Sequence, residues 1–121
     1  MVVADNLSNS KRESIETIKR ITNQEIPFYE VDISDRQAVE RIFETNHIDG
    51  VIHFAGLKAV GESVEKPAMY YENNLISTLV LVKSCIKFGV NRFVFSSSAT
   101  GYRENEVPFV GTMERFPTTN P

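Results

Sequence analysis

Short apolar runs alternate with stretches of helical period along the 121 residues. Continuous apolar runs, as opposed to alternating ones, are typical of strands buried on both faces of a parallel sheet. Between the runs, apolar residues recur every three or four positions, which predicts three helices. The resulting order, strand and helix three times and then a strand, predicts an α/β fold with helices on both faces of a parallel sheet. The predicted strands are Met1–Ala4, Phe28–Val31, Val51–Ala55 and Arg92–Phe95.

Local signals predict where the first two helices begin. Ser10 followed by Glu13, and Ser34 followed by Gln37, have the spacing of a capping box, in which two side chains satisfy backbone N–H groups at a helix start. Pro27 is expected to end the first helical segment.

The last helix is predicted to be long. Pro67 suits its first position and Gly89 suits the cap at its carboxyl end. Its apolar line is formed by Leu75, Leu79, Val82 and Ile86.

Composition fits one soluble domain, with 41% hydrophobic and 24% charged residues. The net charge of −3 gives no electrostatic reason to expect nucleic acid or an anionic membrane as a partner. The longest apolar stretch, Leu75–Val82, is too short to span a membrane.

The single cysteine, Cys85, excludes an internal disulfide and suits a reducing compartment, so we expect a cytoplasmic protein with a buried, inert thiol. No metal-binding spacing is present, and we expect no metal.

Three predicted strands end in groups that could contact a ligand, because ligands of parallel sheets bind outside the carboxyl ends of the strands. Asp5 could accept both ribose hydroxyls of an adenosine and would repel a 2′-phosphate. A plain turn aspartate is the favoured alternative when Asp5 is considered alone. Asp32 could accept from an adenine amino group or be a solvated acid. The serines from Ser96 could bind a substrate oxygen or simply begin a polar loop.

Two features of nucleotide-dependent oxidoreductases do not occur within the chain. No glycine precedes Gly50, so there is no glycine-rich loop to approach a pyrophosphate before Asp5. No Tyr-x-x-x-Lys occurs, and a phenol with a pKa near 10 is a poor base without a neighbouring ammonium. These residues alone predict an α/β domain that could bind a nucleotide.

Four motifs add a family resemblance. VIHFAGLKAVGESVEKP at Val51–Pro67 resembles the signature of UDP-glucose 4-epimerases, an extended branch of the short-chain dehydrogenase/reductase superfamily. DNLSNS at Asp5–Ser10, YYENN at Tyr70–Asn74 and FSSSAT at Phe95–Thr100 match the same family in the same order. Related sugar-nucleotide dehydratases usually carry an acidic pair where this chain has Gly101 and Tyr102, which favours the epimerase.

The resemblance implies a partial Rossmann-like, doubly wound parallel sheet that lacks its first βα unit. Residues 1–98 would be a partial NAD-binding domain, and residues 99–121 a loop region leading to the missing catalytic Tyr-x-x-x-Lys. In the strand order 3-2-1-4-5, Met1–Ala4 and Val51–Ala55 would flank the absent strand. Two unpaired edges would then face a gap of about 9–10 Å. We expect these edges either to close on each other or to stay open.

By resemblance, the intact enzyme interconverts UDP-glucose and UDP-galactose in galactose metabolism. A tyrosine, aided by a lysine and a serine, removes the proton of the sugar 4-hydroxyl, and NAD takes the hydride and returns it to the other face of the sugar. Ser98 would be the catalytic serine and Thr100 would lie against the sugar. The substrate would be a UDP-sugar, and a homodimer is compatible with the resemblance.

The isolated chain is expected to be inactive. The alternatives are a non-catalytic nucleotide-binding remnant or assembly partner, or another NAD-dependent sugar-nucleotide epimerase or dehydratase.

The same resemblance assigns the NAD contacts. The ribose of adenosine would be surrounded by Asp5, Asn6, Leu7, Ser8, Asn9 and Ser10. Adenine would contact Asp32 and Ile33, and Asn73 would reach the cofactor from the long helix. The pyrophosphate and nicotinamide ribose would pass along Phe54, Ala55, Gly56 and Lys58.

Overall fold

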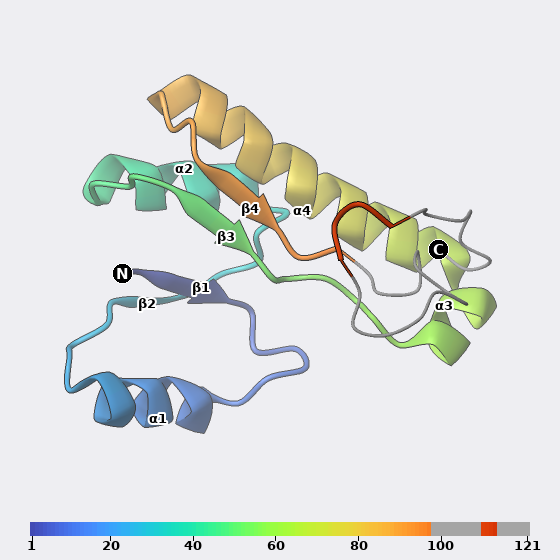
Figure 1. The fold of residues 1–121 in the computed structure, drawn as a ribbon, viewed down its shortest axis with the longest axis horizontal. Coiled ribbons are helices and arrows are strands. Elements are labelled where there is room, and N and C mark those ends of the chain that lie inside the picture. The colour runs from blue at the N-terminus through green and yellow to red at the C-terminus, as the bar shows by residue number, and fades with distance from the viewer. Residues whose placement is uncertain (98–109, 114–121) are drawn as a thin grey trace.

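The computed structural model describes residues 1–97 and 110–113 and has the predicted alternation of strands and helices (Figure 1). A short helix, α3, is an addition that the sequence pattern did not predict. The elements are β1 (Val3–Asp5), α1 (Arg12–Thr22), β2 (Phe28–Glu30), α2 (Arg36–Thr45), β3 (Val51–His53), α3 (Val60–Glu65), α4 (Pro67–Phe88) and β4 (Phe93–Phe95).

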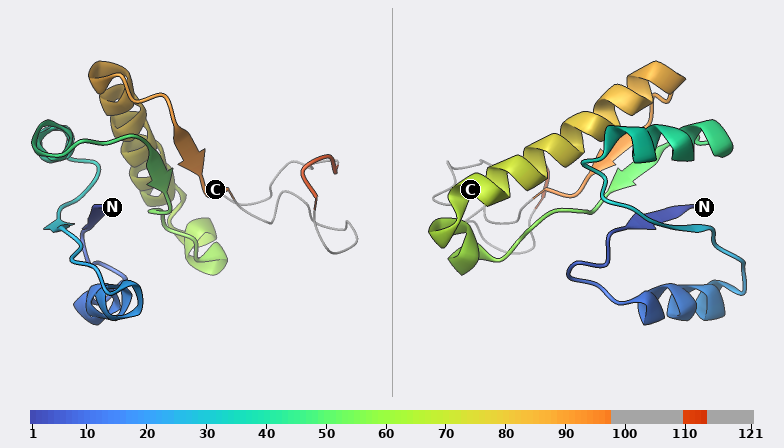
Figure 2. Two further views of the ribbon diagram at one scale, coloured as in Figure 1. Left: turned by 60° about the vertical axis from the view of Figure 1, so that its left-hand side comes forward. Right: turned by 180° about the vertical axis from the view of Figure 1, so that it is seen from behind.

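The strands form two parallel pairs. β1 pairs with β2, with Val3 opposite Phe28, and β3 pairs with β4, with Val51 opposite Phe93. No ladder joins β1 to β3. The left view of Figure 2 shows the order β4, β3, β1, β2, so that β3 and β1 are the inner strands. The two edges that we expected to flank a missing strand have therefore not closed on each other.

Helices cover both sides of the strands, as a doubly wound fold requires. α1 lies on one side, and α2 and α4 lie on the other (Figure 2). The partial Rossmann-like sheet predicted from the resemblance is thus present. Among the described residues, no helix has the length and apolar character needed to cross a membrane.

The core lies where α2, α4 and the β3–β4 pair meet. Val39 of α2 packs with Val80 and Leu81 of α4. Partly buried side chains complete this cluster: Ile33, Phe43, Val51 and Phe93. Cys85 is also buried, and burial raises the pKa of its thiol, which confirms the buried thiol that was expected.

The apolar line predicted for α4 does not face this core. Leu75, Leu79 and Ile86 are 56%, 54% and 76% exposed, whereas Ser77, Leu81 and Ser84 are buried. Because each residue turns a helix by about 100°, the two sets lie on opposite sides of α4. The helix is apolar on both sides, and its serine-bearing side is the one that packs inward.

The predicted capping boxes were both wrong in detail. Lys11 precedes α1 without capping it, and Ser10 Oγ instead donates to Asp5 Oδ1 over 2.8 Å.

α1 ends at Thr22, before a left-handed Asn23, and not at Pro27. Pro67 and Gly89 do begin and cap α4 as predicted.

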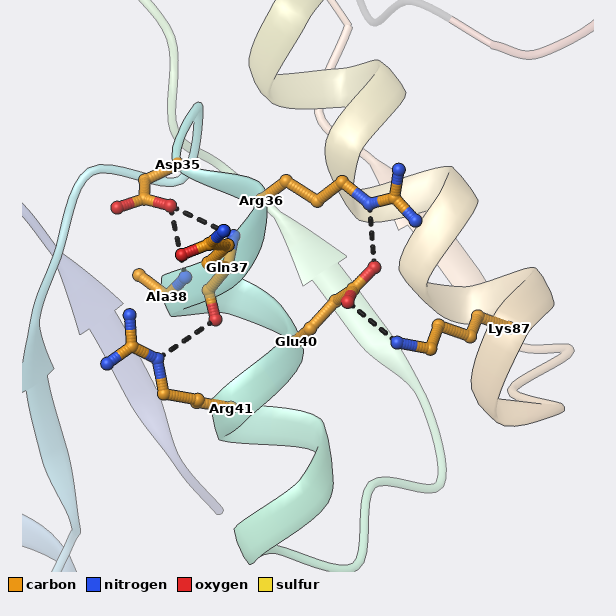
Figure 3. A network of polar contacts seen from close by, with 7 residues as sticks. All are labelled: Asp35, Arg36, Gln37, Ala38, Glu40, Arg41 and Lys87. Carbon is orange, nitrogen blue, oxygen red and sulfur yellow. Dashed lines mark hydrogen bonds and ion pairs between the residues drawn. The ribbon is translucent and has the colours of Figure 1, made fainter.

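The cap of α2 is one residue later than predicted. Asp35 Oδ1 accepts from the backbone N–H groups of Gln37 and Ala38 at 2.9 and 3.1 Å (Figure 3).

Further along α2, Glu40 accepts from Arg36 Nε and from Lys87 Nζ of α4, each at 2.7 Å (Figure 3). The Lys87 and Arg36 hydrogen bonds lower the pKa of Glu40, so this carboxylate ties α2 to α4.

Candidate nucleotide-binding site

The carboxyl ends of β1 and β2 bring two acids together. Asp5 is the last residue of β1, and Asp32 follows β2 by two residues. Asn6 Nδ2 donates to Asp32 Oδ2 over 3.4 Å, which joins the two loops. The structure therefore places the predicted ribose and adenine residues beside each other.

Two Asx turns shape the loop after β1. Asp5 Oδ1 accepts from the backbone N–H of Leu7 at 2.7 Å, and Asn6 Oδ1 accepts from that of Ser8 at 3.0 Å. Together with the Ser10 hydroxyl on Asp5, these bonds hold Leu7 at a φ of 55°. A left-handed leucine is unfavourable by about 1–2 kcal/mol, so the turns fix a conformation that the chain would otherwise avoid.

Asp5 has one carboxylate oxygen available for the predicted ribose contact. Its Oδ1 is engaged by the loop, whereas its Oδ2 accepts no hydrogen bond from any residue that the structure describes. A fixed carboxylate with one open oxygen can accept from a ribose hydroxyl, and its charge would repel a 2′-phosphate. The geometry thus suits NAD better than NADP.

Asp32 is a weaker candidate for its predicted contact. Hydrogen bonds donated by the Ser34 hydroxyl and by the Ser34 backbone N–H lower the pKa of Asp32. Burial raises this pKa by less, and the hydrogen bond from Asn6 makes the smallest contribution, which lowers it. Only Oδ2, with its long bond to Asn6, remains for an adenine amino group. The side chain of Ile33 packs against the α2–α4 core.

The loop after β3 lies against α4. Phe54, Ala55 and Lys58 are exposed, and Gly56 is not. A Cβ on Gly56 would stand 3.3 Å from Asn74 Oδ1, tighter than most real contacts. A larger residue here would press on the Asn74 side chain, so the close approach of the loop to the helix favours glycine.

Asn74 is the residue that sequence reasoning missed. Its Oδ1 accepts from the backbone N–H of Leu57 at 2.8 Å, and its Nδ2 donates to the Leu57 carbonyl at 3.1 Å. Asn73 Nδ2 donates to the same Oδ1 at 2.9 Å. The signal in the sequence was the Asn-Asn pair itself. Asparagine is a poor helix former, so two of them in an apolar helix indicate side-chain hydrogen bonds to a neighbouring segment.

Asn73, the predicted cofactor residue, borders a hollow of about 370 Å³. Ser34, Met69, Glu72 and Ile76 complete its lining. Asn73 therefore faces the Asp32–Ser34 turn, on the side predicted for adenine.

His53 extends the Asn74 network into the sheet. The Thr78 hydroxyl donates its hydrogen to the backbone carbonyl of Asn74 at 2.7 Å. Because that hydrogen is used, the Thr78 oxygen accepts from His53 Nε2, 3.0 Å away. The ring is then the neutral Nε2–H tautomer, and its Nδ1 is buried without a partner among the described residues. Burial, and secondarily the charge of Lys58, lower the pKa of His53.

The remaining predictions fall elsewhere. Ser98 and Thr100, the predicted catalytic and substrate residues, lie outside the described residues. Among the described residues, no group of three or more His, Cys, Asp or Glu side chains is placed to hold a metal ion.

A parallel α/β fold with an acidic side chain at the carboxyl end of a strand is typical of the dinucleotide-binding class of proteins. A sequence profile of the NAD dependent epimerase/dehydratase family matches residues 1–121, and the chain belongs to this family. It is 54% identical over 122 residues to a UDP-glucose 4-epimerase of Haemophilus influenzae and 51% identical over 123 residues to one of Bacillus subtilis. Each match covers 100% of this chain and 36% of the relative, so the chain spans about a third of these relatives' length.

Solved structures agree. A UDP-glucose 4-epimerase from Bifidobacterium longum, in complex with NAD⁺ and UDP, superposes with a TM-score of 0.92 at 48% identity, covering 99% of this chain and 36% of that one. A Thermus thermophilus UDP-glucose 4-epimerase complexed with NAD gives 0.77 at 34% identity, covering 96% and 36%.

Proposed function

We propose that this chain is part of the NAD-binding domain of a UDP-glucose 4-epimerase. The intact enzyme would interconvert UDP-glucose and UDP-galactose by transient oxidation at the sugar C4. The observation that carries the proposal is the identity of about half of all residues with proteins of that name along the whole chain. The open oxygen of Asp5 supports the NAD part of it.

Each site residue then has a role. Asp5 accepts from the adenosine ribose, with Asn6, Leu7, Ser8, Asn9 and Ser10 shaping the loop. Asn73 and the Asp32–Ser34 turn flank adenine. Gly56 lets the loop after β3 lie close to α4, and Phe54, Ala55, Gly56 and Lys58 pass along the pyrophosphate and nicotinamide ribose. When bound, NAD supplies a reversible hydride acceptor. Ser98 would hydrogen-bond the sugar 4-hydroxyl and Thr100 would contact the sugar, roles that rest on the family resemblance.

We infer that the 121-residue chain alone does not epimerise UDP-galactose. No Tyr-x-x-x-Lys lies within it to act as the acid–base pair. Loss of such groups commonly removes a factor of roughly 10²–10⁴ in rate. Turnover of UDP-galactose by the purified chain, free of host enzyme, would disprove this.

A chimaera tests the function directly. The matching segment of the Haemophilus influenzae relative is replaced by residues 1–121 of this chain. We expect the chimaera to epimerise UDP-galactose and its Ser98→Ala variant to lose most activity. A folded, NAD-binding chimaera that is inactive on UDP-galactose would overturn the proposal, and activity only on another UDP-sugar would support the alternative of a different sugar-nucleotide epimerase or dehydratase.

The remaining expectations are also proposals. The outward apolar stripe of α4, with Leu75, Leu79 and Ile86 exposed, favours a homodimer of the intact enzyme. The single buried thiol of Cys85 favours a reducing, cytoplasmic location. A non-catalytic assembly partner is the second candidate function, and the unpaired edges of β1 and β3 are the observation that favours it.

A further inference from the structure

Lys58 is an exposed cation whose neighbours on both sides are held by hydrogen bonds. None of the described residues forms an ion pair with Lys58. Leu57, before it, has its backbone N–H and carbonyl both bonded to the Asn74 side chain of α4. Ala59, after it, accepts at its carbonyl from the Ser63 N–H of α3 at 2.9 Å. The backbone on each side of Lys58 is therefore fixed, and its ammonium is left for other contacts.

A buried tyrosine fixes α3, the helix that holds Ala59, to α4. Tyr70 lies in the first turn of α4 and is 2% exposed, and its hydroxyl donates to Glu62 Oε2 of α3 at 2.9 Å. The other oxygen of Glu62 accepts from Lys66 Nζ at 3.1 Å. α3 packs against the start of α4 (Figure 1), so the Tyr70–Glu62 hydrogen bond joins two elements that are already in contact.

The protonation states of the two partners suit this hydrogen bond. Burial, then the hydrogen bond to Glu62 and the charge of Glu62, raise the pKa of Tyr70, and a backbone hydrogen bond from Ala59 lowers it by less. The hydrogen bonds from Lys66 and Tyr70 lower the pKa of Glu62. At neutral pH the phenol therefore donates and the carboxylate accepts. Tyr70 thus contacts both α3 and the residue that follows Lys58.

We propose that Tyr70 and Glu62 are positioning residues, which hold Lys58 where its ammonium meets the pyrophosphate of a bound dinucleotide. The inference rests on the proposed function, in which Lys58 passes along the pyrophosphate and nicotinamide ribose. Tyr70 and Glu62 act through Lys58 and do not touch the cofactor themselves. A lysine side chain is flexible, so fixing its backbone beforehand lowers the entropy that binding must remove.

The test measures the release of NAD from the chimaera described above, by exchange against labelled NAD with no UDP-sugar present. Tyr70→Phe keeps the buried ring and removes the hydroxyl. We expect NAD to leave this variant about fivefold faster, the loss that corresponds to one hydrogen bond. Tyr71→Phe makes the same change at the adjacent tyrosine, which is 55% exposed, and should leave the rate unchanged. Equal release from the unaltered chimaera and a folded Tyr70→Phe variant would overturn the inference.

A double-mutant cycle separates positioning from a purely structural role. Lys58→Met removes the ammonium and should also speed the release of NAD. Because Tyr70 acts through Lys58, adding Tyr70→Phe to the Lys58→Met variant should cause no further acceleration. A further acceleration of about fivefold in that background would show that the Tyr70 hydroxyl only supports the fold, and it would contradict the positioning role.

Two changes at Glu62 decide the question if Tyr70→Phe fails to fold. Glu62→Gln keeps an oxygen that can accept from Tyr70, so NAD release should stay close to the unaltered rate, whereas Glu62→Leu should accelerate it about fivefold. Equal release from these two variants would overturn the inference. A chimaera that retains NAD but does not epimerise UDP-galactose would contradict the proposed function and leave the positioning role standing, and a folded chimaera that binds no NAD would contradict both.

Discussion

Asp5 uses only one of its two carboxylate oxygens within the part of the chain that the structure describes. One oxygen holds the loop that places Leu7 in a left-handed conformation, and the other remains open. Its position at the end of a strand was predictable from the sequence, because a polar residue ended an apolar run. The Ser10 contact was not predictable, since Ser10 has an equally good local signal for capping a helix.

The isolated chain should bind NAD weakly, because no glycine-rich loop lies within it, with a residual preference for NAD over NADP. Asp5→Asn keeps an oxygen for Leu7 and Ser10 but removes the charge, so the preference should disappear. Calorimetry with both cofactors measures this. Binding of NAD at about 1 μM or tighter would contradict the first expectation. Equal binding of NADP by the unaltered chain would contradict the role of Asp5.

His53 should make stability depend on pH. Burial lowers the pKa of His53 in the folded state, so the unfolded state binds the proton first as the pH falls. The stabilisation is present above the unfolded pKa of about 6.5 and is lost as the pH falls towards the folded value.

Urea unfolding of the chimaera between pH 7.5 and 5 tests this dependence. His53→Gln should flatten the pH dependence, and His47→Gln, which alters an exposed histidine, should leave it unchanged. A chimaera whose stability does not fall towards pH 5 would show that the account of His53 is wrong.

At the scale of elements, α4 shows what a sequence can and cannot specify. Pro67 and Gly89 are local signals, and they predicted both ends of the helix. The buried side was not predictable, because α4 carries apolar residues all around and only the tertiary packing selects one side. Asn74 was missed for a related reason: it adjoins Asn73, but a turn of about 100° aims it at the loop after β3.

Two leucines of α4 test the assignment of its buried side. Leu81 is 8% exposed and packs in the core, whereas Leu79 is 54% exposed. Leu81→Ala should lower the free energy of unfolding by about 2–5 kcal/mol. Leu79→Ala should change it by no more than about 0.5 kcal/mol. The comparison is made by urea unfolding of the chimaera at a concentration where it is monomeric. Equal losses of stability in the two variants would contradict the assignment of the Leu81 side of α4 as the buried side.

At the scale of the whole molecule, the chain is two parallel strand pairs with facing unpaired edges. The strand order predicted from the resemblance required such a space, and β1 and β3 have not closed it. The roles expected of Ser98 and Thr100 rest on family motifs alone, because these residues have no local signal beyond a polar run after a strand. An unpaired backbone group costs about 1–3 kcal/mol when buried, against a total stability of about 5–15 kcal/mol for a domain. We therefore expect the free chain to be molten or to associate.

Amide hydrogen exchange on the 121-residue chain tests this account most directly. We predict that a monomeric sample lacks strong protection of the backbone amides across β1 and β3. Strong protection across both β1 and β3 in a monomeric sample would contradict the account.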